Sequence, residues 1–496
     1  MQLRRYIHIV FITVTTVFYS QAQKEANNWY FGYGAGLTWN TTQDTVTATG
    51  LFGTPNLILK GLPTALTGSS ISTLEGCFSL SDSKGELLFY SDGKTVWNKN
   101  NVAMPNGTGL TGNDSSTQSG IIIPYPGIPN KYIAVTLGVN LTDNLSYSII
   151  DMTLDGGLGD VVLAEKNIRF VGHSGKTGET VTSVKHANGQ DYWIIAPGRG
   201  QNPTYMNAWL VTSQGISTTP VVTTLPIYNT SQNVGAYMKI SADGKSFAWV
   251  THAYKQLVYG KFDASTGLFS NVKQVGTESN PYGVEFSASG KYVFVTHEGS
   301  GRPLYVYDFE DLMSDTETRK VYTMPGGSTG ALQLGPDGRM YIALSGNTFL
   351  YVIDNPEDFE NLRIYQLPNY FLGTGSSLRS GLGLPSFAAN WFSVSIDADQ
   401  SFCVNTSQDF TVILNQSGAD EIAYTEWDFG EGGSFLKDTN VSSGTQTHSY
   451  TYEKPGMYNI TVRSYLADGK EVASETITVK VNPCVLPVNP NIHLYN

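Results

Sequence analysis

The sequence predicts an all-β protein, a seven-bladed β-propeller followed by a second, smaller β-domain. The prediction rests on a recurring β-meander, on a composition suited to short strands and tight turns, and on a change of pattern after Val394. The meander is clearest in residues 235–263, where Asp243-Gly244 and His252-Ala253 separate apolar runs. Turn dipeptides such as Asp-Gly between alternating apolar runs are a strong hairpin signal. This stretch is therefore expected to form consecutive antiparallel strands.

The meander recurs along most of the chain. Each copy opens at a glycine, and successive copies are spaced by 44, 58, 57, 48, 47 and 51 residues. A β-meander repeated every 40 to 50 residues or so is typical of propellers. Seven strand starts favour seven blades, with six or eight as the alternatives. The opening glycines are Gly76, Gly120, Gly178, Gly235, Gly283, Gly330 and Gly381.

Composition narrows the function classes. Charged residues make up 15% of the 496 residues, against about 25% in an average domain. The net charge is −12, and no basic run is present. An acidic chain without a basic patch is a poor nucleic-acid binder and a poor ligand for anionic lipids. We therefore expect neither partner.

The N-terminus predicts export. Arg4 and Arg5 precede an apolar stretch, and Ser20-Gln21-Ala22 is a small-residue cleavage site, so residues 1–22 are expected to be a secretory signal. No later segment is expected to span a bilayer. We predict periplasmic or cell-surface localisation. In that oxidising setting Cys403 and Cys484, which bracket the C-terminal domain, are expected to pair, with two unpaired thiols as the alternative.

Domain boundaries follow from these patterns. Residues 23–394 are assigned to the propeller, 395–483 to the second domain and 484–496 to a C-terminal tail. Because an open sheet edge promotes aggregation, strands in 28–40 are expected to complete the last blade beside residues 383–393. Two polar stretches are rich in turn residues: 41–72 is expected to be a long insert, and 98–119 is expected to be a loop.

The second domain carries a recognisable motif. Trp427-Asp428-Phe429-Gly430-Glu431-Gly432 is followed by a stretch, 452–462, that contains Pro455-Gly456 and Tyr458. This pair of motifs resembles the PKD domain, an immunoglobulin-like β-sandwich. Glu431 replaces the second aspartate of the usual motif, and Tyr450 stands where a histidine is usual. The resemblance implies the sandwich fold.

The first half of the chain also resembles a family. The phrases NWYFGYGAGLTWN and LEGCFSLSDSKGELLFYSDGKTVWN look like those of exported propeller–PKD proteins from gliding, type IX-secreting gram-negative bacteria. The resemblance covers most of residues 28–482. It implies association with the cell surface or the secretion machinery, and it supplies no reaction.

A candidate ligand site follows from propeller geometry. The loop that enters the innermost strand and the end of the second strand lie on one face, around the central axis. His252 and His297 are read as equivalent second-strand ends, and their recurrence is also explained by the repeat alone. The side chains expected on this rim are Glu75, Gln118, Glu179, Arg199, Asn233, His252, Asn280, His297, Glu298 and Ser328.

Known catalytic and cofactor motifs are not matched in a competent context. Residues 326–330 fit G-x-S-x-G, but a strand is expected to follow, whereas a nucleophile elbow requires a helix. We predict no metal, no cofactor and no catalytic residue. The leading hypothesis is an exported, non-enzymatic interaction protein that binds an envelope or secretion-machinery protein, with the tail as a docking peptide. The alternatives are a carbohydrate-binding or carbohydrate-active protein and a lactonase-like enzyme.

Overall fold

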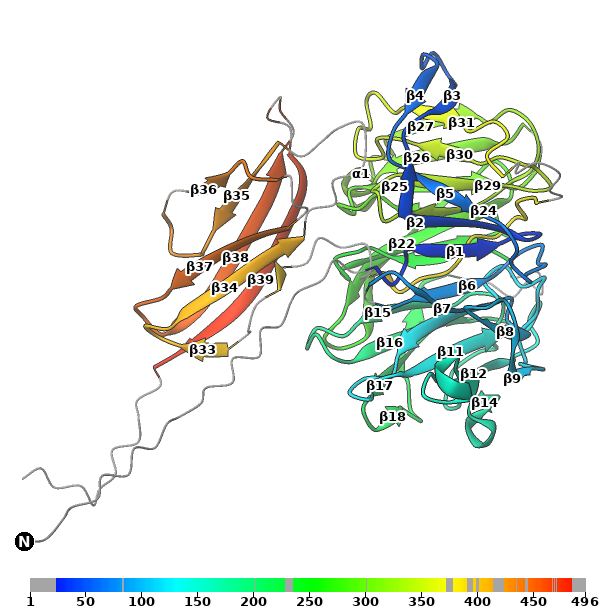
Figure 1. The fold of residues 1–496 in the computed structure, drawn as a ribbon, viewed down its shortest axis with the longest axis horizontal. Coiled ribbons are helices and arrows are strands. Elements are labelled where there is room, and N and C mark those ends of the chain that lie inside the picture. Colours follow the sequence, from blue (N-terminus) through cyan, green and yellow to red (C-terminus); the bar gives the residue numbers. More distant parts are fainter. Residues whose placement is uncertain are drawn as a thin grey trace, which may run out of the picture.

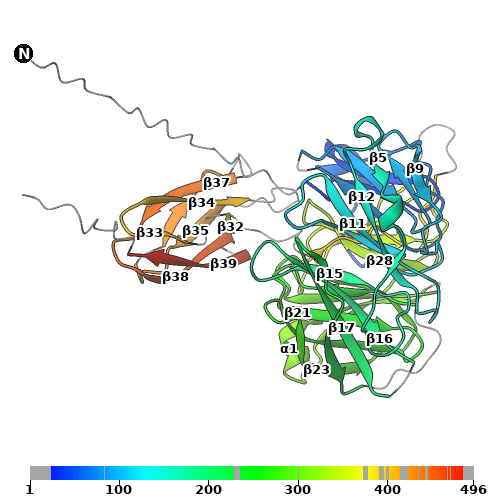
Figure 2. The ribbon, with the colours of Figure 1, turned by 90° about the horizontal axis from the view of Figure 1, so that it is seen from below.

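The structure is a computed structural model of the chain. It describes residues 24–82, 84–200, 202–227, 235–299, 301–371, 378–389, 396–397, 401–413, 423–433, 435–441, 445–465, 467, 469 and 471–483. The predicted signal segment 1–22 and the tail 484–496 lie outside these residues. Figures 1 and 2 show a large body of radiating sheets and a separate, smaller sandwich.

The predicted meander is confirmed in residues 238–263. Strands β20 (Met238–Ile240), β21 (Ser246–Thr251) and β22 (Gln256–Asp263) pair antiparallel in sequence order. Gly244 closes the first turn with a φ of 72°, a left-handed conformation that glycine adopts without strain. A fourth strand, β23 (Leu268–Gly276), completes the sheet at its outer edge.

Seven such sheets form the large body, which confirms the predicted fold class. Six follow one another along the chain, and their first strands contact each other around a central axis, as β20 contacts β24 and β24 contacts β28. Blade one holds β6 (Phe78–Ser81), β7 (Leu87–Ser91), β8 (Thr95–Asn98) and β9 (Ala103–Thr108). Blade two holds β10 (Gly120–Pro124), β11 (Lys131–Leu137), β12 (Leu145–Asp151), β13 (Asp160–Val161) and β14 (Ile168–Arg169). Blade three holds β15 (Thr182–Lys185), β16 (Tyr192–Gly198), β17 (Thr204–Thr212), β18 (Gly215–Ile216) and β19 (Val221–Leu225).

Blade four is the meander described above. Blade five holds β24 (Pro281–Phe286), β25 (Tyr292–His297), β26 (Pro303–Asp308) and β27 (Arg319–Thr323). Blade six holds β28 (Thr329–Leu334), β29 (Met340–Leu344), β30 (Tyr351–Ile353) and β31 (Ile364–Gln366). The short helices are α1 (Phe309–Met313), η1 (Asp155–Gly157) and η2 (Leu163–Glu165).

The N-terminal strands supply the seventh sheet. It contains β1 (Asn28–Phe31), β2 (Ala35–Gln43) and β5 (Leu62–Leu66). The segment 379–388 runs along it: Tyr33 and Arg379 exchange backbone hydrogen bonds, and the Phe387 ring lies 6.0 Å from that of Trp29. The same segment bridges to its other neighbour, since Pro385 pairs with Cys77 beside β6. Both ends of the propeller sequence therefore meet here, as the predicted closure requires.

Two polar stretches fold into more strand than expected. The predicted insert at 41–72 holds β5 and a hairpin of β3 (Val46–Gly50) and β4 (Leu57–Leu59) that extends blade six by pairing with β31. The predicted loop 98–119 contains β9. The expectation of a loop is wrong at β9, which pairs with the preceding strand β8. The pairing of β3 with β31 joins distant parts of the chain and leaves no local sequence signal.

The second domain is a sandwich of two sheets. One sheet has the order β32 (Ile396–Asp397), β34 (Ser407–Ile413), β37 (Thr445–Thr451), and the other has the order β33 (Ser401–Cys403), β39 (Glu471–Asn482), β38 (Gly456–Tyr465), β35 (Tyr424–Asp428), β36 (Leu436–Asp438). Trp427 is fully buried in its core, against Phe429 and beside His448. A large aromatic core residue suits a small domain.

The cysteines divide between the two domains. Cys77 is free and buried in the propeller. Cys403 takes part in a disulfide bond. Its predicted partner, Cys484, lies outside the described residues, so this pairing stays a prediction. Among the helices that the structure describes, none has the length and apolar character needed to cross a membrane.

Candidate functional site

A carboxylate and two hydroxyls meet at the mouth of the central axis. The Tyr282 hydroxyl, from blade five, donates to Oε1 of Glu75 at 2.9 Å, and the Ser115 hydroxyl donates to Oε2 at 3.1 Å. Glu75 precedes the inner strand of blade one, so the first bond spans 207 residues of sequence. Tyr282 is 3% exposed, and Glu75 is half-buried. The bond therefore joins blades that are not neighbours, close to the axis.

The environment of Glu75 makes its ionisation unfavourable. The pKa of this carboxyl is raised to about 7, mainly by burial and to a smaller extent by the nearby charges of Glu179 and Glu298. The hydrogen bonds from Tyr282 and Ser115 act in the opposite direction. A carboxyl with a pKa near neutrality can serve as a donor or as an acceptor toward a ligand.

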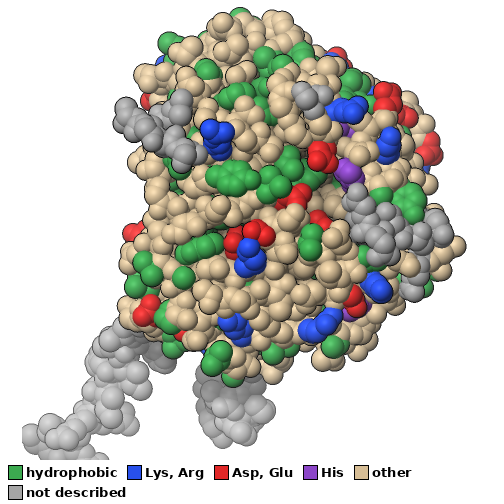
Figure 3. Space-filling model, turned by 90° about the vertical axis from the view of Figure 1, so that its right-hand side faces the viewer, with side chains coloured by type: hydrophobic (Ala, Val, Ile, Leu, Met, Phe, Trp, Pro, Cys, Tyr) green, Lys and Arg blue, Asp and Glu red, His purple; other side chains and the backbone are tan. Residues whose placement is uncertain are grey.

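A histidine–carboxylate pair lies on the same rim. His252 Nε2 is 2.9 Å from Oε2 of Glu298, and the two side chains are 13% and 43% exposed. This hydrogen bond lowers the pKa of Glu298. Figure 3 shows the face, on which acidic side chains and a histidine lie beside hydrophobic side chains near the centre. The rim thus presents exposed carboxylate oxygen to solvent.

The strand registers show that His252 and His297 do not occupy corresponding positions in blades four and five. Ala248 pairs with Lys239, and Phe294 pairs with Glu285, the corresponding residue of the next blade. Counting four residues onward, His252 corresponds to Glu298, and Thr251 corresponds to His297. The reading of His252 and His297 as equivalent positions is wrong by one residue. A shift of one residue turns a side chain to the other face of a strand, so His252 points to the rim while His297 points inward.

Two of the predicted rim residues are buried beneath it. Arg199 is 1% exposed and His297 is 0% exposed. His297 Nδ1 lies 2.8 Å from the Pro303 carbonyl, which requires the Nδ1–H tautomer, and burial lowers its pKa to about 4. Burial likewise lowers the pKa of Arg199 to about 9, while Glu179 raises it. These side chains do not line the mouth.

Two more predicted residues hold loops together. Glu179 accepts from the backbone N–H and hydroxyl of Thr117 at 2.9 Å each and from the Asn140 N–H at 2.5 Å. Gln118 Oε1 accepts from the Met238 N–H at 3.1 Å, which ties blade two to blade four. Both are buried. Their side chains therefore position the entry loops, and they are engaged within the fold instead of facing the mouth.

The remaining predicted residues lie at the mouth or outside the described chain. The Asn280 carbonyl accepts from the Glu298 N–H at 3.0 Å, and Ser328 Oγ accepts from the Gly299 N–H at 2.9 Å. Both side chains are half-buried. Asn233 lies outside the described residues. The structure therefore brings Glu75, His252 and Glu298 together near one opening, with Asn280 and Ser328 supporting it.

Sequence reasoning missed the aromatic residues of the axis. Tyr282 holds Glu75, and Tyr237, its neighbour in blade four, lies at 1% exposure with its hydroxyl 3.5 Å from the Leu384 carbonyl. The ring centroids of the two tyrosines are 5.8 Å apart. The available signal was the tyrosine that recurs at the start of two successive inner strands, in Gly235-Ala236-Tyr237 and Asn280-Pro281-Tyr282.

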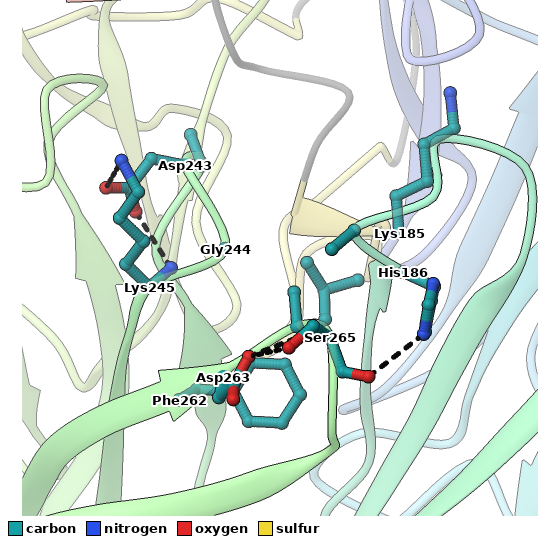
Figure 4. Close-up of a pocket in the computed structure, with 12 residues that line it drawn as sticks. Lys185, His186, Asp243, Gly244, Lys245, Phe262, Asp263 and Ser265 are labelled. Carbon is teal, nitrogen blue, oxygen red and sulfur yellow. Dashed lines mark hydrogen bonds and ion pairs between the residues drawn. The ribbon is translucent and has the colours of Figure 1, made fainter. Parts of the chain in front are cut away.

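A second hollow lies at the opposite end of the strands. Figure 4 shows this groove of about 430 Å³, formed by the turns of blades three and four. His186 Nε2 faces the Ser265 carbonyl at 3.2 Å, and Asp263 accepts from the Ser265 N–H and hydroxyl. The turn at Gly244 precedes β21 whereas His252 follows it, so groove and rim occupy opposite faces. No predicted site residue lines the groove.

The lactonase alternative calls for a metal centre. Across the described residues, no group of three or more His, Cys, Asp or Glu side chains is arranged to hold a metal ion. His252 and Glu298 form a pair of suitable donors but not a cluster. The geometry of these two residues alone gives no metal centre.

Two solved structures are similar to the chain at low sequence identity. A candidate 6-phosphogluconolactonase from Bacteroides uniformis is 10% identical, with a TM-score of 0.41, over 72% of this chain and 98% of that one. The periplasmic gluconolactonase PpgL of Pseudomonas aeruginosa is 12% identical, with a TM-score of 0.35, over 79% and 94%. No curated protein sequence matches the chain. These likenesses concern the fold alone.

A further solved structure and one family model are each similar to a part of the chain. The fibronectin(III)-like modules of Clostridium thermocellum CbhA are 23% identical, with a TM-score of 0.16, over 19% of this chain and 99% of that one. The family model of the PKD domain matches residues 393–481. That range contains both sheets of the sandwich and the Trp427 motif. The chain is thus an all-β protein in which a propeller of seven sheets is followed by a PKD domain.

Proposed function

We propose that the chain is an exported, non-enzymatic interaction protein that binds its partner at the axial mouth of the propeller. The observation that carries the proposal is the meeting of Glu75, Tyr282 and Glu298 at one opening, from loops and strands of two non-adjacent blades. Glu298 is 43% exposed, so its carboxylate is available to a partner. The partner is a protein of the cell envelope, tied to type IX secretion or gliding as the family resemblance implies.

Export is supported by two parts of the sequence. The charged start and apolar stretch of residues 1–22 have the pattern of a secretory signal. The C-terminal PKD match is in keeping with an extracytoplasmic protein. Within this proposal the PKD domain spaces or docks the propeller, and the tail from residue 485 is a docking peptide.

The test is a native pull-down from intact envelopes with purified protein that begins at residue 23. Glu75→Gln and Glu298→Gln alter the mouth. Lys245→Gln is the matched control, since Lys245 lies in the groove on the opposite face with a side chain 74% exposed. A stoichiometric partner that is recovered with wild type and control and lost with both mouth variants is the expected result. Equal recovery with all four proteins would refute the axial mouth as the binding face.

The tail is tested in the same experiment. A version that ends at residue 484 is expected to lose part of its partner profile. An unchanged profile would remove the tail from the account while leaving the mouth in place. The two results are therefore read separately.

A glycan ligand is the second candidate. Two carboxylates, Glu75 and Glu298, converge as a sugar site requires. The rings of Tyr237 and Tyr282 are at most 3% exposed, so they offer no stacking face. We therefore rank glycan binding second. Glycan-array binding by wild type that is lost in Glu298→Gln would reverse this order.

A further inference from the structure

Beneath the rim, blade four buries two polar side-chain atoms on its strand β21. Nε1 of Trp249 and Oγ1 of Thr251 have no hydrogen-bond partner among the residues that the structure describes. Their side chains are 0% and 1% exposed. Both belong to β21 and are two residues apart, so they lie on the same face of that strand. Trp249 packs in a core cluster shared with blade three, so this face is directed toward that blade.

A buried positive charge lies at the same interface. The guanidinium carbon of Arg199 is 4.7 Å from the centre of the Trp249 ring. Its Nη2 donates to Oγ1 of Thr180 at 2.5 Å. The carboxylate whose charge acts on Arg199 is that of Glu179. Glu179 already accepts three hydrogen bonds from Thr117 and Asn140.

We infer that an oxyanion binds among the buried side chains of Arg199, Trp249 and Thr251, a proposed site that we call the recess. The indole N–H can only donate, and a threonine hydroxyl can donate as well. An oxyanion, whether a carboxylate or a phosphate-type group, accepts at each oxygen and complements a guanidinium charge. Leaving such groups unsatisfied in the interior is destabilising. A bound oxyanion offsets that loss at Trp249 and Thr251 together.

The recess connects to the rim through one residue. His252 follows Thr251 directly and its side chain is 13% exposed beside Glu298. Because the recess residues are at most 1% exposed, an anion enters only when rim side chains move aside. Slow association is therefore expected. This site is distinct in position from the Glu75 mouth.

The first test measures anion binding by the full mature chain. Sodium acetate and sodium phosphate are compared with sodium chloride at equal ionic strength, by calorimetric titration and by thermal unfolding. Wild type is expected to gain thermal stability in acetate or phosphate beyond chloride. Trp249→Phe and Thr251→Val, which remove the two orphan groups and keep the shape, are each expected to weaken binding at least tenfold. A response to acetate only identifies a carboxylate ligand, and a response to phosphate only identifies a phosphate-type ligand.

The matched control is Trp209→Phe. Trp209 is also fully buried, but its Nε1 already donates to the Val171 carbonyl at 3.0 Å. This variant is expected to lose stability and to keep the anion response of wild type. Equal loss of binding in Trp209→Phe and Trp249→Phe would overturn the proposal, since it would reflect general destabilisation.

A second measurement separates an oxyanion from an ordered water. In chloride alone, Thr251→Val removes a buried hydroxyl without a partner, so the variant is expected to melt at a higher temperature than wild type. Thr251→Ser restores the hydroxyl and is expected to restore anion binding. Two results together would show that the recess holds a buried water and no anion: a lower melting temperature for Thr251→Val, and no specific response of wild type to acetate or phosphate. That result would overturn the inference and leave the axial-mouth proposal untouched.

Discussion

At the axial mouth, the proton of Glu75 links the site to the stability of the fold. Its pKa is about 7 in the folded protein and 4.5 in the reference state. The folded state therefore binds more protons than the unfolded state between these values. The free energy of unfolding falls as pH rises through this window, and it is flat above it. His297 contributes the opposite slope between about pH 4 and pH 6.5, because its pKa is lowered.

Glu75→Gln is expected to remove the fall in the free energy of unfolding that Glu75 causes as pH rises. The amide keeps hydrogen-bonding capacity toward Tyr282 and carries no charge to desolvate. The variant should match wild type at about pH 5 and be more stable at about pH 8. Urea unfolding across this range measures the difference, with Glu310→Gln, an exposed carboxylate on α1, as the control for charge removal. Parallel curves for wild type and Glu75→Gln would contradict the assignment.

A buried ionic network anchors blade six to the N-terminal hairpin. Arg339 is 1% exposed, with Nε 2.8 Å from Asp354 and Nη1 3.3 Å from Asp337. It also donates to the carbonyls of Lys60 at 3.0 Å and Gly61 at 3.3 Å. The side chains of both carboxylates are fully buried, so their charges depend on cationic partners within the fold.

Arg339→Met is expected to be strongly destabilising. Removing one member of a buried ion pair leaves an uncompensated charge and costs about 3–5 kcal/mol. Arg363 shares Asp354 at 3.1 Å but is 31% exposed, so Arg363→Gln should cost less than about 1 kcal/mol. Denaturant unfolding of the two variants measures the contrast. Similar losses for both would show that Arg339 contributes by packing alone.

At the scale of elements, blade closure depends on close backbone approach. A Cβ on Gly330 in β28 would lie 2.0 Å from the Leu382 carbonyl oxygen. Leu382 belongs to the segment 379–388, which already accepts a hydrogen bond from the Ala331 N–H at 2.7 Å. The last blade and its neighbour therefore fit only because this position lacks a side chain.

Gly330→Ala tests this closure. Overpacking against rigid backbone costs about 1–3 kcal/mol and often more. Gly276 in β23 has nothing within 4 Å of an added Cβ, so Gly276→Ala should stay within about 0.5 kcal/mol of wild type. Thermal unfolding monitored by circular dichroism distinguishes them. A Gly330→Ala protein as stable as Gly276→Ala would refute the close approach.

The elements that the sequence predicts are those with local signals. The meander of blade four is readable because Asp243-Gly244 fixes the turn between adjacent runs. The pairing of the β3–β4 hairpin with blade six cannot be read from the sequence, because Thr49 pairs with Gln366, more than 300 residues away. No pattern within 41–72 announces that partner. The rim can be predicted only in part. The sequence predicts which loops form it, but a difference of one residue in strand register places His252 on the rim and buries His297.

The axial contacts are also beyond sequence reasoning. Tyr282 and Glu75 meet only once the ring of blades has closed. The contacts of Lys239 also form only after the ring has closed. Its Nζ lies 2.8 Å from Glu285 Oε2 and 2.5 Å from Gln333 Oε1. These three residues occupy aligned positions of three successive inner strands. The repeat predicts that such positions align, and it does not predict which of them face the axis.

On the scale of the whole molecule, the two domains have separate cores. Trp427, Phe429 and Ile460 belong to a cluster of the PKD sandwich that contains no propeller residue. The propeller cores are built from residues 26–388. Domains with separate cores are expected to unfold in separate transitions. A change confined to one core should therefore leave the other transition in place.

Cys403→Ser tests that independence together with the disulfide. Cys403 is disulfide-bonded, and with Cys484 as its predicted partner the bond closes nearly the whole PKD domain. A loop of this size stabilises by about 4 kcal/mol on the chain-entropy model, so the sandwich transition should move to a markedly lower temperature. The propeller transition of Cys403→Ser should stay at its wild-type temperature. Cys77→Ser, which changes a free buried cysteine of the propeller, should affect only the propeller transition. Differential scanning calorimetry resolves both transitions.

If Cys403→Ser lowers both transitions together, the domains are coupled through an interface. If neither moves while Cys484→Ser lowers the sandwich transition, the predicted pairing is wrong.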